Sequence, residues 1–356
     1  MRKNSSKKSR QSDRKKLVTI TGGTGGYTLL SGLKGLPFDI SAIVSMADDG
    51  GSTGELRDKW GALPPGDVRQ CLAALSPAEN DIRELMSHRA EKGPFRGHTF
   101  GNVFLSWLQE MHGDSFYEAV QSASRVLNIA GEVIPVTLDD ARLAARLSDG
   151  TVIYGEDEIE KTDLQTSGFD KLFYESKVRA NREALERIRE ADGIVLGPGS
   201  LYESVLSNLV VPGVSDAVAR SEAKVIFIVN LTNKRGHTSG WSVERHVEEV
   251  EKFIGKGRVN YVLVNTKNPP QSLLARYQKQ EGEDALVKCG ECGIKSERKV
   301  CTYRVVKGDL MNGTLPRESK SDPKAALRSF IRHDPSKLAR AVHFIVDFVE
   351  GGYTVV

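Results

Sequence analysis

Two glycine-rich segments are the residues whose types and spacing most directly suggest chemistry. They comprise Gly22, Gly23, Thr24 and Gly25, and Gly197, Pro198, Gly199 and Ser200. Each follows a short apolar run and precedes a helical pattern, with Ser200 expected as a helix N-cap. In such a turn backbone N–H groups can approach an anion, and the helix dipole favours negative charge. The first segment lacks the third glycine of the dinucleotide fingerprint and the lysine of a Walker loop. A structural tight turn is the alternative. Two such loops nevertheless predict one multiply charged ligand, which a nucleoside diphosphate suits better than a monoanion.

A pair of adjacent carboxylates is the second candidate. Asp48 and Asp49 end an apolar run and are followed by Gly50, Gly51 and Ser52. A dinucleotide enzyme keeps one acid near this place for a ribose hydroxyl, whereas Mg²⁺ prefers one or two carboxylates together with phosphate oxygens. An Asp-Gly turn is the structural alternative. Because five polar or glycine residues exceed what a turn needs, we interpret the segment as functional.

Two predicted helix starts carry further polar side chains. Asp67 is expected at a helix N-cap, with Arg69 in the first turn. A base there opposes the helix dipole, so an anion within its reach explains Arg69 better. His98 and Asn102 open another helix and offer donors to a ligand, although a structural histidine is an equal alternative.

The cysteines give a weaker signal. Cys289 and Cys292 have the spacing of a zinc knuckle, and Cys301 follows eight residues later. A closed structural zinc site needs four ligands, and Cys71 lies far away on a predicted helix. We therefore expect these residues to be inert, with a redox or zinc role as the alternative.

The elements that must position these residues alternate between strands and helices. Strands are predicted at residues 17–21, 40–46, 193–196, 224–229 and 261–264, and helices at residues 67–75, 101–111, 181–191, 201–209, 243–254 and 335–349. Continuous apolar strands of this length are typical of a parallel sheet covered on both faces. The expected fold is α/β, with a Rossmann-like, mostly parallel sheet. Ligands of such sheets bind at the carboxyl ends of the strands, where the glycine and aspartate residues fall.

Residues 132–176 have a different, alternating pattern around an Asp-Gly pair, which predicts a small antiparallel hairpin insertion. No proline-rich or serine-rich linker divides the rest, so we expect a single domain over residues 17–356. Residues 1–16 hold eight basic residues and one acid. They are expected to form a disordered basic tail.

Composition narrows the function classes. The net charge of the 356 residues is +3. Since the tail alone carries +7, the remaining 340 residues carry −4. A weakly acidic body argues against specific nucleic-acid binding. No run of about 20 apolar residues is present to span a membrane. Four cysteines form no disulfide framework, which favours a reducing cytoplasm.

Seven ordered motifs resemble the bacterial YvcK proteins, called gluconeogenesis factors: TGGTGG, ADDGGSTG, PPGDVRQCL, GHTFGNVFL, GPGSLYES, NLTNKRG and IRHDPSKLARAV. These proteins share a superfamily with CofD, the 2-phospho-L-lactate transferase of deazaflavin cofactor synthesis. The resemblance implies a Rossmann-like sheet that binds a nucleotide. YvcK relatives bind UDP-sugars such as UDP-N-acetylglucosamine, and CofD relatives use a GDP-linked donor with Mg²⁺.

The resemblance also implies site residues. The two glycine segments would hold phosphates, and a polar wall would comprise Asp48, Asp49, Ser52, Asp67, Arg69, His98, Asn102, Asn230 and Thr232. Tyr277 and Arg332 would stack on the sugar nucleotide and pair with its charge. If the protein is a transferase, Asp49 would be catalytic and would hold the metal together with Asp48.

Two function classes stay open. The first is a regulatory protein that senses a sugar nucleotide and acts on cell shape, the cell wall and carbon metabolism through protein partners. The second is a CofD-like phosphotransferase that joins a phosphorylated small acid to a flavin-like alcohol. Whether any reaction is catalysed, and whether the chain forms a homo-oligomer, stays open at this point.

Overall fold

Seven parallel strands form the central sheet of the computed structural model, which describes residues 14–290, 302–313 and 331–348. The strand order is β10-β9-β8-β7-β1-β2-β3. The strands are β1 (Lys15–Thr21), β2 (Phe38–Val44), β3 (Glu132–Pro135), β7 (Gly193–Leu196), β8 (Lys224–Ile228), β9 (Tyr261–Asn265) and β10 (Arg304–Gly308). Five predicted strands and the parallel sheet are therefore confirmed.

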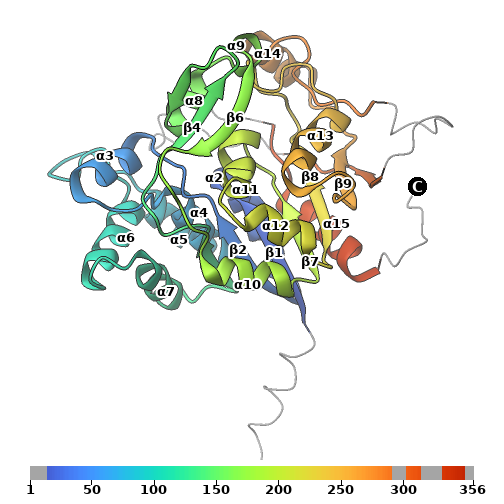
Figure 1. The fold of residues 1–356 in the computed structure, drawn as a ribbon. Helices are drawn as coiled ribbons and strands as arrows, with labels where there is room; N and C mark the ends of the chain where they lie inside the picture. The colour runs from blue at the N-terminus through green and yellow to red at the C-terminus, as the bar shows by residue number, and fades with distance from the viewer. Residues whose placement is uncertain (1–13, 291–301, 314–330, 349–356) are drawn as a thin grey trace, which may run out of the picture.

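Helices lie on both faces of this sheet (Figure 1). They are α2 (Gly23–Leu33), α3 (Gly51–Trp60), α4 (Gly66–Leu75), α5 (Glu79–Ser87), α6 (Phe100–Met111), α7 (Phe116–Val126), α10 (Arg182–Glu190), α11 (Ser207–Leu209), α12 (Val214–Arg220), α13 (Val243–Ile254), α14 (Gln271–Glu281) and α15 (Pro335–Phe348), with a π-helical turn at Leu201–Leu206. Helices α2, α4 and α15 pack together, and α10 packs on α12 across the sheet from them. Right-handed crossovers explain this division, because the chain proceeds from β1 toward β3 and later from β7 toward β10 in the opposite direction.

The insertion is smaller and more complex than the sequence predicted. Residues 132–135 do not belong to it, because β3 pairs parallel with β2 at the edge of the main sheet. A run of four residues is too short for its period to separate these two arrangements. The insertion itself is a three-stranded antiparallel sheet of β4 (Leu143–Leu147), β5 (Val152–Tyr154) and β6 (Phe169–Tyr174), with the short helices α8 (Glu156–Lys161) and α9 (Leu164–Ser167).

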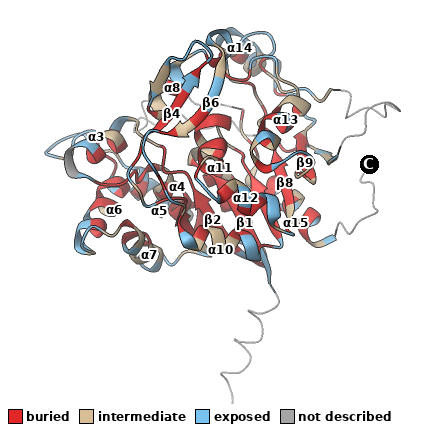
Figure 2. Cartoon of the chain, viewed as in Figure 1, coloured by how far each residue is buried: buried red, intermediate tan, exposed pale blue. Residues whose placement is uncertain are grey.

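One hydrophobic core joins the insertion to the main sheet. Leu17 and Ile20 of β1 are fully buried, and the same cluster includes Leu143 and Leu172 of the insertion. Figure 2 shows the buried residues following the strands and the inner faces of the helices. The predicted tail falls largely outside the described residues. Its last two positions, Lys15 and Lys16, are the first residues of β1.

Two predicted helix starts differ in detail. Helix α4 begins at Gly66 with Pro65 as its N-cap, so Asp67 lies in the first turn and is not the cap. Ser200 occupies the N-cap position of the π-helical turn, but its side chain makes no capping hydrogen bond. At α15 the expected start is confirmed: the Lys337 N–H donates to the Asp334 carboxylate at 2.9 Å.

The contact between α2 and α15 gives a test of the fold. A Cβ atom at Gly32 would lie 2.6 Å from the Pro335 carbonyl carbon and 3.0 Å from the Ala339 Cβ. Since backbone cannot yield as a flexible side chain does, Gly32→Ala should cost about 1–3 kcal/mol of unfolding free energy. Urea denaturation measures this. Gly35→Ala is the matched control, because no atom lies within 4 Å of its added Cβ. Equal stability of the two variants would contradict the packing.

Candidate functional site

The predicted site loops lie at one edge of the sheet. They follow β1, β2, β7 and β8, which are mutually parallel, so their carboxyl ends point the same way. The reversal in strand order falls between β1 and β7. Open α/β sheets bind ligands in the crevice at such a switch point. The expectation of a shared edge is confirmed.

The two glycine loops interlock at this point. A Cβ at Gly25 would lie 2.6 Å from the Pro198 carbonyl carbon and 2.9 Å from the Gly199 Cα. The Thr21 hydroxyl donates to the Pro198 carbonyl at 2.8 Å. Gly199 has φ +159° and Gly197 has φ +76°, a conformation that favours glycine. These two loops therefore hold each other in place.

Asn230, just past the end of β8, fixes the second loop. Its side-chain oxygen accepts from the Gly199 N–H at 3.3 Å, and its side-chain nitrogen donates to the Gly199 carbonyl at 2.7 Å. These two hydrogen bonds orient the backbone of Gly199. Asn230 therefore supports the second loop, and its predicted contact with the ligand stays a prediction.

The first turn of α2 offers backbone donors to a ligand. Its N-cap is Gly22, which has no side chain to cap the helix, and its first turn contains no acidic residue. The initial N–H groups of a helix have no partner within the helix. The Asp67 carboxylate lies against Gly22 and Gly23 at the side of this turn. A substituent at Gly22 would collide with it, which explains the glycine.

A polar network follows β2. The Thr53 hydroxyl donates to the Asp48 carboxylate at 2.8 Å. The Asn102 amide donates to the Ser52 and Thr53 hydroxyls at 3.2 and 3.4 Å. His98 Nδ1 lies 3.1 Å from the Ser52 hydroxyl. Burial raises the pKa of Asp48 above its ordinary value, against the lowering effect of Thr53 and Arg69. Four of the predicted residues are thus brought together as one buried network.

Asp49 has a different place from its neighbour. Its carboxylate accepts from the Glu156 and Asp157 N–H groups at 3.1 and 2.9 Å. These are the first residues of α8, so Asp49 caps a helix of the insertion. Both of its oxygens are used in this way. The geometry favours a structural role for Asp49 over the predicted catalytic one.

The residues predicted as metal ligands do not converge. Asp48 accepts from Thr53 and from the Gly50 N–H, whereas Asp49 faces α8. Among the described residues, no group of three or more His, Cys, Asp or Glu side chains is arranged to hold a metal ion. Asp48 and Asp49 therefore have separate protein partners in this structure, and the Mg²⁺ pair expected of a transferase stays a prediction.

Arg69 is anchored by its surroundings. Its Nη1 donates to the Met86 carbonyl at 3.0 Å. Its alkyl chain packs where a Cβ at Gly101 would otherwise stand, 2.5 to 2.8 Å from that position. The guanidinium also lowers the pKa of Asp48, against the larger effect of burial. These contacts explain why an arginine is present in the first turn of α4. The sequence alone did not show this structural role.

Tyr277 and Thr232 lie beside a second, smaller core. Tyr277 is 5% exposed and packs with Leu231 and Ile331, and its hydroxyl accepts from the Ile331 N–H at 3.4 Å. In this position its ring has no free face to stack on a ligand, unlike the prediction. Thr232 pairs with Leu286 in an isolated β-bridge.

His333, the neighbour of Arg332, attaches their segment to the chain just past the end of β8. Buried His333 hydrogen bonds to the backbone of Val229, just past the end of β8, and burial lowers its pKa to about 4. The Arg332 carbonyl accepts from the Asn312 N–H at 2.8 Å. Its half-buried side chain therefore lies on the segment that closes over the end of β8.

Four site residues were not identified from the sequence. Glu203 is 3% exposed and lies 3.2 Å from His237 Nδ1 and 3.4 Å from Lys234 Nζ. Burial by itself would raise the pKa of Glu203, but Lys234 and His237 together lower it to about 2. Glu203 and Lys234 occur in motifs that the sequence analysis quoted, GPGSLYES and NLTNKRG. The tertiary structure brings Glu203 and Lys234 together, and the spacing of the two residues in the sequence did not indicate this pairing.

His237 joins three segments. Its Nε2 lies 3.1 Å from both the Ile159 and Thr162 carbonyls of the insertion. Its Nδ1 faces the Glu203 carboxylate. The ring therefore bridges the Glu203 carboxylate and two backbone carbonyls of the insertion.

Glu156 is the fourth residue. It opens α8 and faces the acids of the loops: burial raises its pKa to about 10, with Asp48, Glu203 and Asp67 adding to the effect. At neutral pH its carboxyl is therefore protonated. This protonation and the ion pairing of Glu203 both reduce the negative charge beside the two glycine loops. An anionic ligand requires such a reduction.

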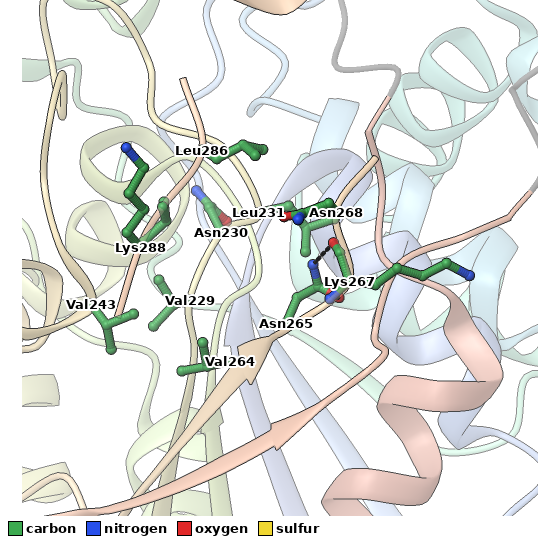
Figure 3. A pocket seen from close by; sticks show the side chains of 11 residues that line it. Val229, Asn230, Leu231, Val243, Val264, Asn265, Lys267, Asn268, Leu286 and Lys288 are labelled. Carbon is green, nitrogen blue, oxygen red and sulfur yellow. Dashed lines mark hydrogen bonds between the residues drawn. The ribbon is translucent and has the colours of Figure 1, made fainter. Parts of the chain in front are cut away.

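A cavity of about 120 Å³ lies between the carboxyl ends of β8 and β9 (Figure 3). It is lined by Val229, Asn230, Leu231, Val243, Val264, Asn265, Lys267, Asn268, Leu286, Val287 and Lys288. Sequence reasoning missed it, because most of these residues are ordinary strand or loop residues.

The described cysteines carry no site. Cys71 is fully buried, and burial raises the pKa of its thiol. Cys289 is a free, half-buried thiol whose pKa burial also raises. Cys292 and Cys301 lie outside the described residues. Across the described ranges, the structure contains no helix that combines the length and apolar character of a membrane span.

The Glu203 cluster predicts a large stability effect. His237→Ala leaves the Glu203 carboxylate buried with Lys234 alone and removes the bonds to Ile159 and Thr162. We expect a loss of about 3–5 kcal/mol in urea unfolding. Adding Glu203→Gln should recover part of it, because no buried charge is then uncompensated. A loss below about 1 kcal/mol would show that the cluster is not coupled to folding.

Glu156 predicts a pH dependence. Its pKa is about 4.5 unfolded and about 10 folded. The folded state therefore binds the extra proton, and this stabilisation is full below pH 4.5 and is lost progressively as pH rises toward 10. Glu156→Gln should raise the melting temperature at pH 8.5 more than at pH 5. Glu158→Gln, on the exposed face of the same helix, is the control. An equal change at both pH values would contradict the raised pKa.

Comparisons with known proteins found a matching family and similar proteins. The family described as 2-phospho-L-lactate transferase CofD matches residues 17–311. A relative from Thermotoga maritima is 43% identical over 270 residues, covering 76% of this chain and 84% of its own. The protein named gluconeogenesis factor in Bacillus subtilis is 38% identical over 265 residues, covering 74% and 82%.

A solved structure agrees with the fold. The crystal structure of a UPF0052 family member from Bacillus halodurans is similar with a TM-score of 0.81 and 34% identity, covering 93% of this chain and 99% of that one. The family model extends over both glycine loops and the polar network. The chain belongs to the CofD family, among the proteins named gluconeogenesis factors.

Proposed function

We propose that this protein is a cytoplasmic regulatory protein that binds a nucleotide sugar, of the UDP-N-acetylglucosamine type, at the two interlocked glycine loops. The interlock carries the proposal. Gly25, Pro198 and Gly199 hold the two loops together at the sheet switch point, next to the glycine-rich start of α2. A diphosphate presents several oxygens, and two adjacent loops of backbone donors match it better than they match a single phosphate.

The electrostatics of the surrounding residues supports an anionic ligand. Protonated Glu156 and paired Glu203 contribute little net negative charge. Arg332 adds a cation on the segment that closes over β8. Sensing of the bound sugar nucleotide would pass to cell-wall or morphogenesis proteins, and so link cell shape to carbon metabolism.

The second candidate is a CofD-like phosphotransferase that uses a GDP-linked donor and Mg²⁺. The family match over residues 17–311 favours it. The position of Asp49 at the start of α8 weighs against it, since a carboxylate that caps a helix with both oxygens is not available to a transferring phosphate. We therefore rank it second.

Isothermal titration calorimetry with UDP-N-acetylglucosamine and GDP, each with and without Mg²⁺, tests the proposal. UDP-N-acetylglucosamine should bind without metal and more tightly than GDP. Gly25→Ala should weaken this binding at least tenfold, because the added methyl forces the loops apart, while Gly35→Ala should leave it unchanged. Tighter binding of GDP that depends on Mg²⁺, with turnover in the presence of an acceptor alcohol, would favour the transferase instead.

A further inference from the structure

The cavity between β8 and β9 begins next to the phosphate loop. Asn230 lines the cavity and also holds both polar groups of the Gly199 peptide. Val229 and Val264 form the floor at the ends of the two strands, and Leu231 and Leu286 form the opposite wall (Figure 3). A ligand with its phosphates at Gly199 can therefore extend into this cavity.

The interior of the cavity is uncharged. The two lysines on its rim are directed away from it in Figure 3. Lys267 pairs with Asp309 at 3.1 Å, and Lys288 pairs with Asp284 at 3.3 Å. Because the lining combines apolar side chains with neutral amides and both lysines are paired with carboxylates, the cavity suits a neutral, partly polar part of a ligand and not a phosphate or an acidic sugar.

Size limits what can enter. Whole small-molecule sites measure about 300–1,000 Å³, so a cavity of about 120 Å³ takes only a part of a nucleotide. An engineered protein cavity of about 150 Å³ holds benzene. The volume is therefore on the scale of one six-membered ring and is small for the fused rings of a purine.

One polar group on the rim is free to recognise that ring. The Asn268 side chain is exposed and makes no hydrogen bond among the described residues. Asn268 and Leu231 both line the cavity. A carboxamide presents a donor beside an acceptor, which complements the N3–H and adjacent carbonyl of uracil. Asn265 is not free in this way, because its oxygen accepts from the Lys267 and Leu310 N–H groups.

We propose that this cavity is the base subsite of the nucleotide ligand and that it takes a single pyrimidine ring, read by Asn268 and enclosed by Leu231 and Leu286. This inference rests on the proposed nucleotide-sugar function. The inference assigns a binding site to the base, which is the part of the ligand that distinguishes one nucleotide from another.

Calorimetry on the full chain tests the subsite with UDP, GDP and inorganic pyrophosphate as probes. Leu286→Trp fills the half-buried rim and should weaken UDP binding at least tenfold, with pyrophosphate affinity unchanged within about twofold. Asn268→Leu, at an exposed position, should weaken UDP binding three- to tenfold. Val126→Trp is the matched control on the exposed end of α7, and it should change neither affinity.

The outcomes separate the two proposals. If UDP binds the unaltered protein but both rim variants bind it equally well, the base lies elsewhere and the subsite is wrong, while the nucleotide-binding function stands. Tighter binding of GDP than UDP would overturn the pyrimidine assignment. A parallel loss of pyrophosphate binding in Leu286→Trp would show that the substitution acts through the loops. If no nucleotide binds the unaltered protein, the proposed function itself fails.

Discussion

The contact between two glycine loops governs the rest of this structure. At the switch point between β1 and β7, the backbone at Pro198 stands where any side chain at residue 25 would have to be. Two backbones approach this closely only if one of them lacks a Cβ atom. The Thr21 hydroxyl and the Asn230 amide then fix the second loop against the first. Because both loops continue from buried parallel strands, the rigid sheet sets their separation, and a ligand need not order them on binding.

A second constraint is electrostatic. The loops offer backbone donors to an anion, but Asp48, Asp67, Glu156 and Glu203 surround them. The structure limits the resulting repulsion by two different means. Glu203 keeps its charge and is compensated by Lys234 and His237. Glu156 has no such partner among the described residues, and burial together with its acidic neighbours raises its pKa and so favours its neutral form. Both means depend on burial, since water would otherwise screen the charges and return the pKa of Glu156 toward its ordinary value.

The insertion is tied to the site at two points. Asp49 caps the start of α8, and His237 binds the carbonyls of Ile159 and Thr162 at its other end. Through these contacts a small antiparallel sheet, which adds no strand to the main sheet, positions Glu156 beside the loops. The residues that hold it come from the loops after β2 and β8. A displacement of these loops would therefore be transmitted to the insertion.

The sequence by itself determined the parallel sheet, its edge and the loops at that edge. Continuous apolar runs that end in glycine or aspartate are local signals, and a strand followed by a glycine turn and a helix folds in only one way with respect to its sheet.

The sequence did not determine the roles of the side chains. Asp49, Arg69 and Tyr277 were all expected at the ligand, yet they cap α8, contact Met86 and Gly101, and fill a small core. Glu156 and His237 were not recognised at all. The physical reason is that a hydrogen bond or a buried charge depends on which distant segment packs against it. That choice is made by the tertiary fold, since the backbone groups that Asp49 binds lie 107 residues or more away along the chain and the carbonyls that His237 binds lie 75 residues or more away.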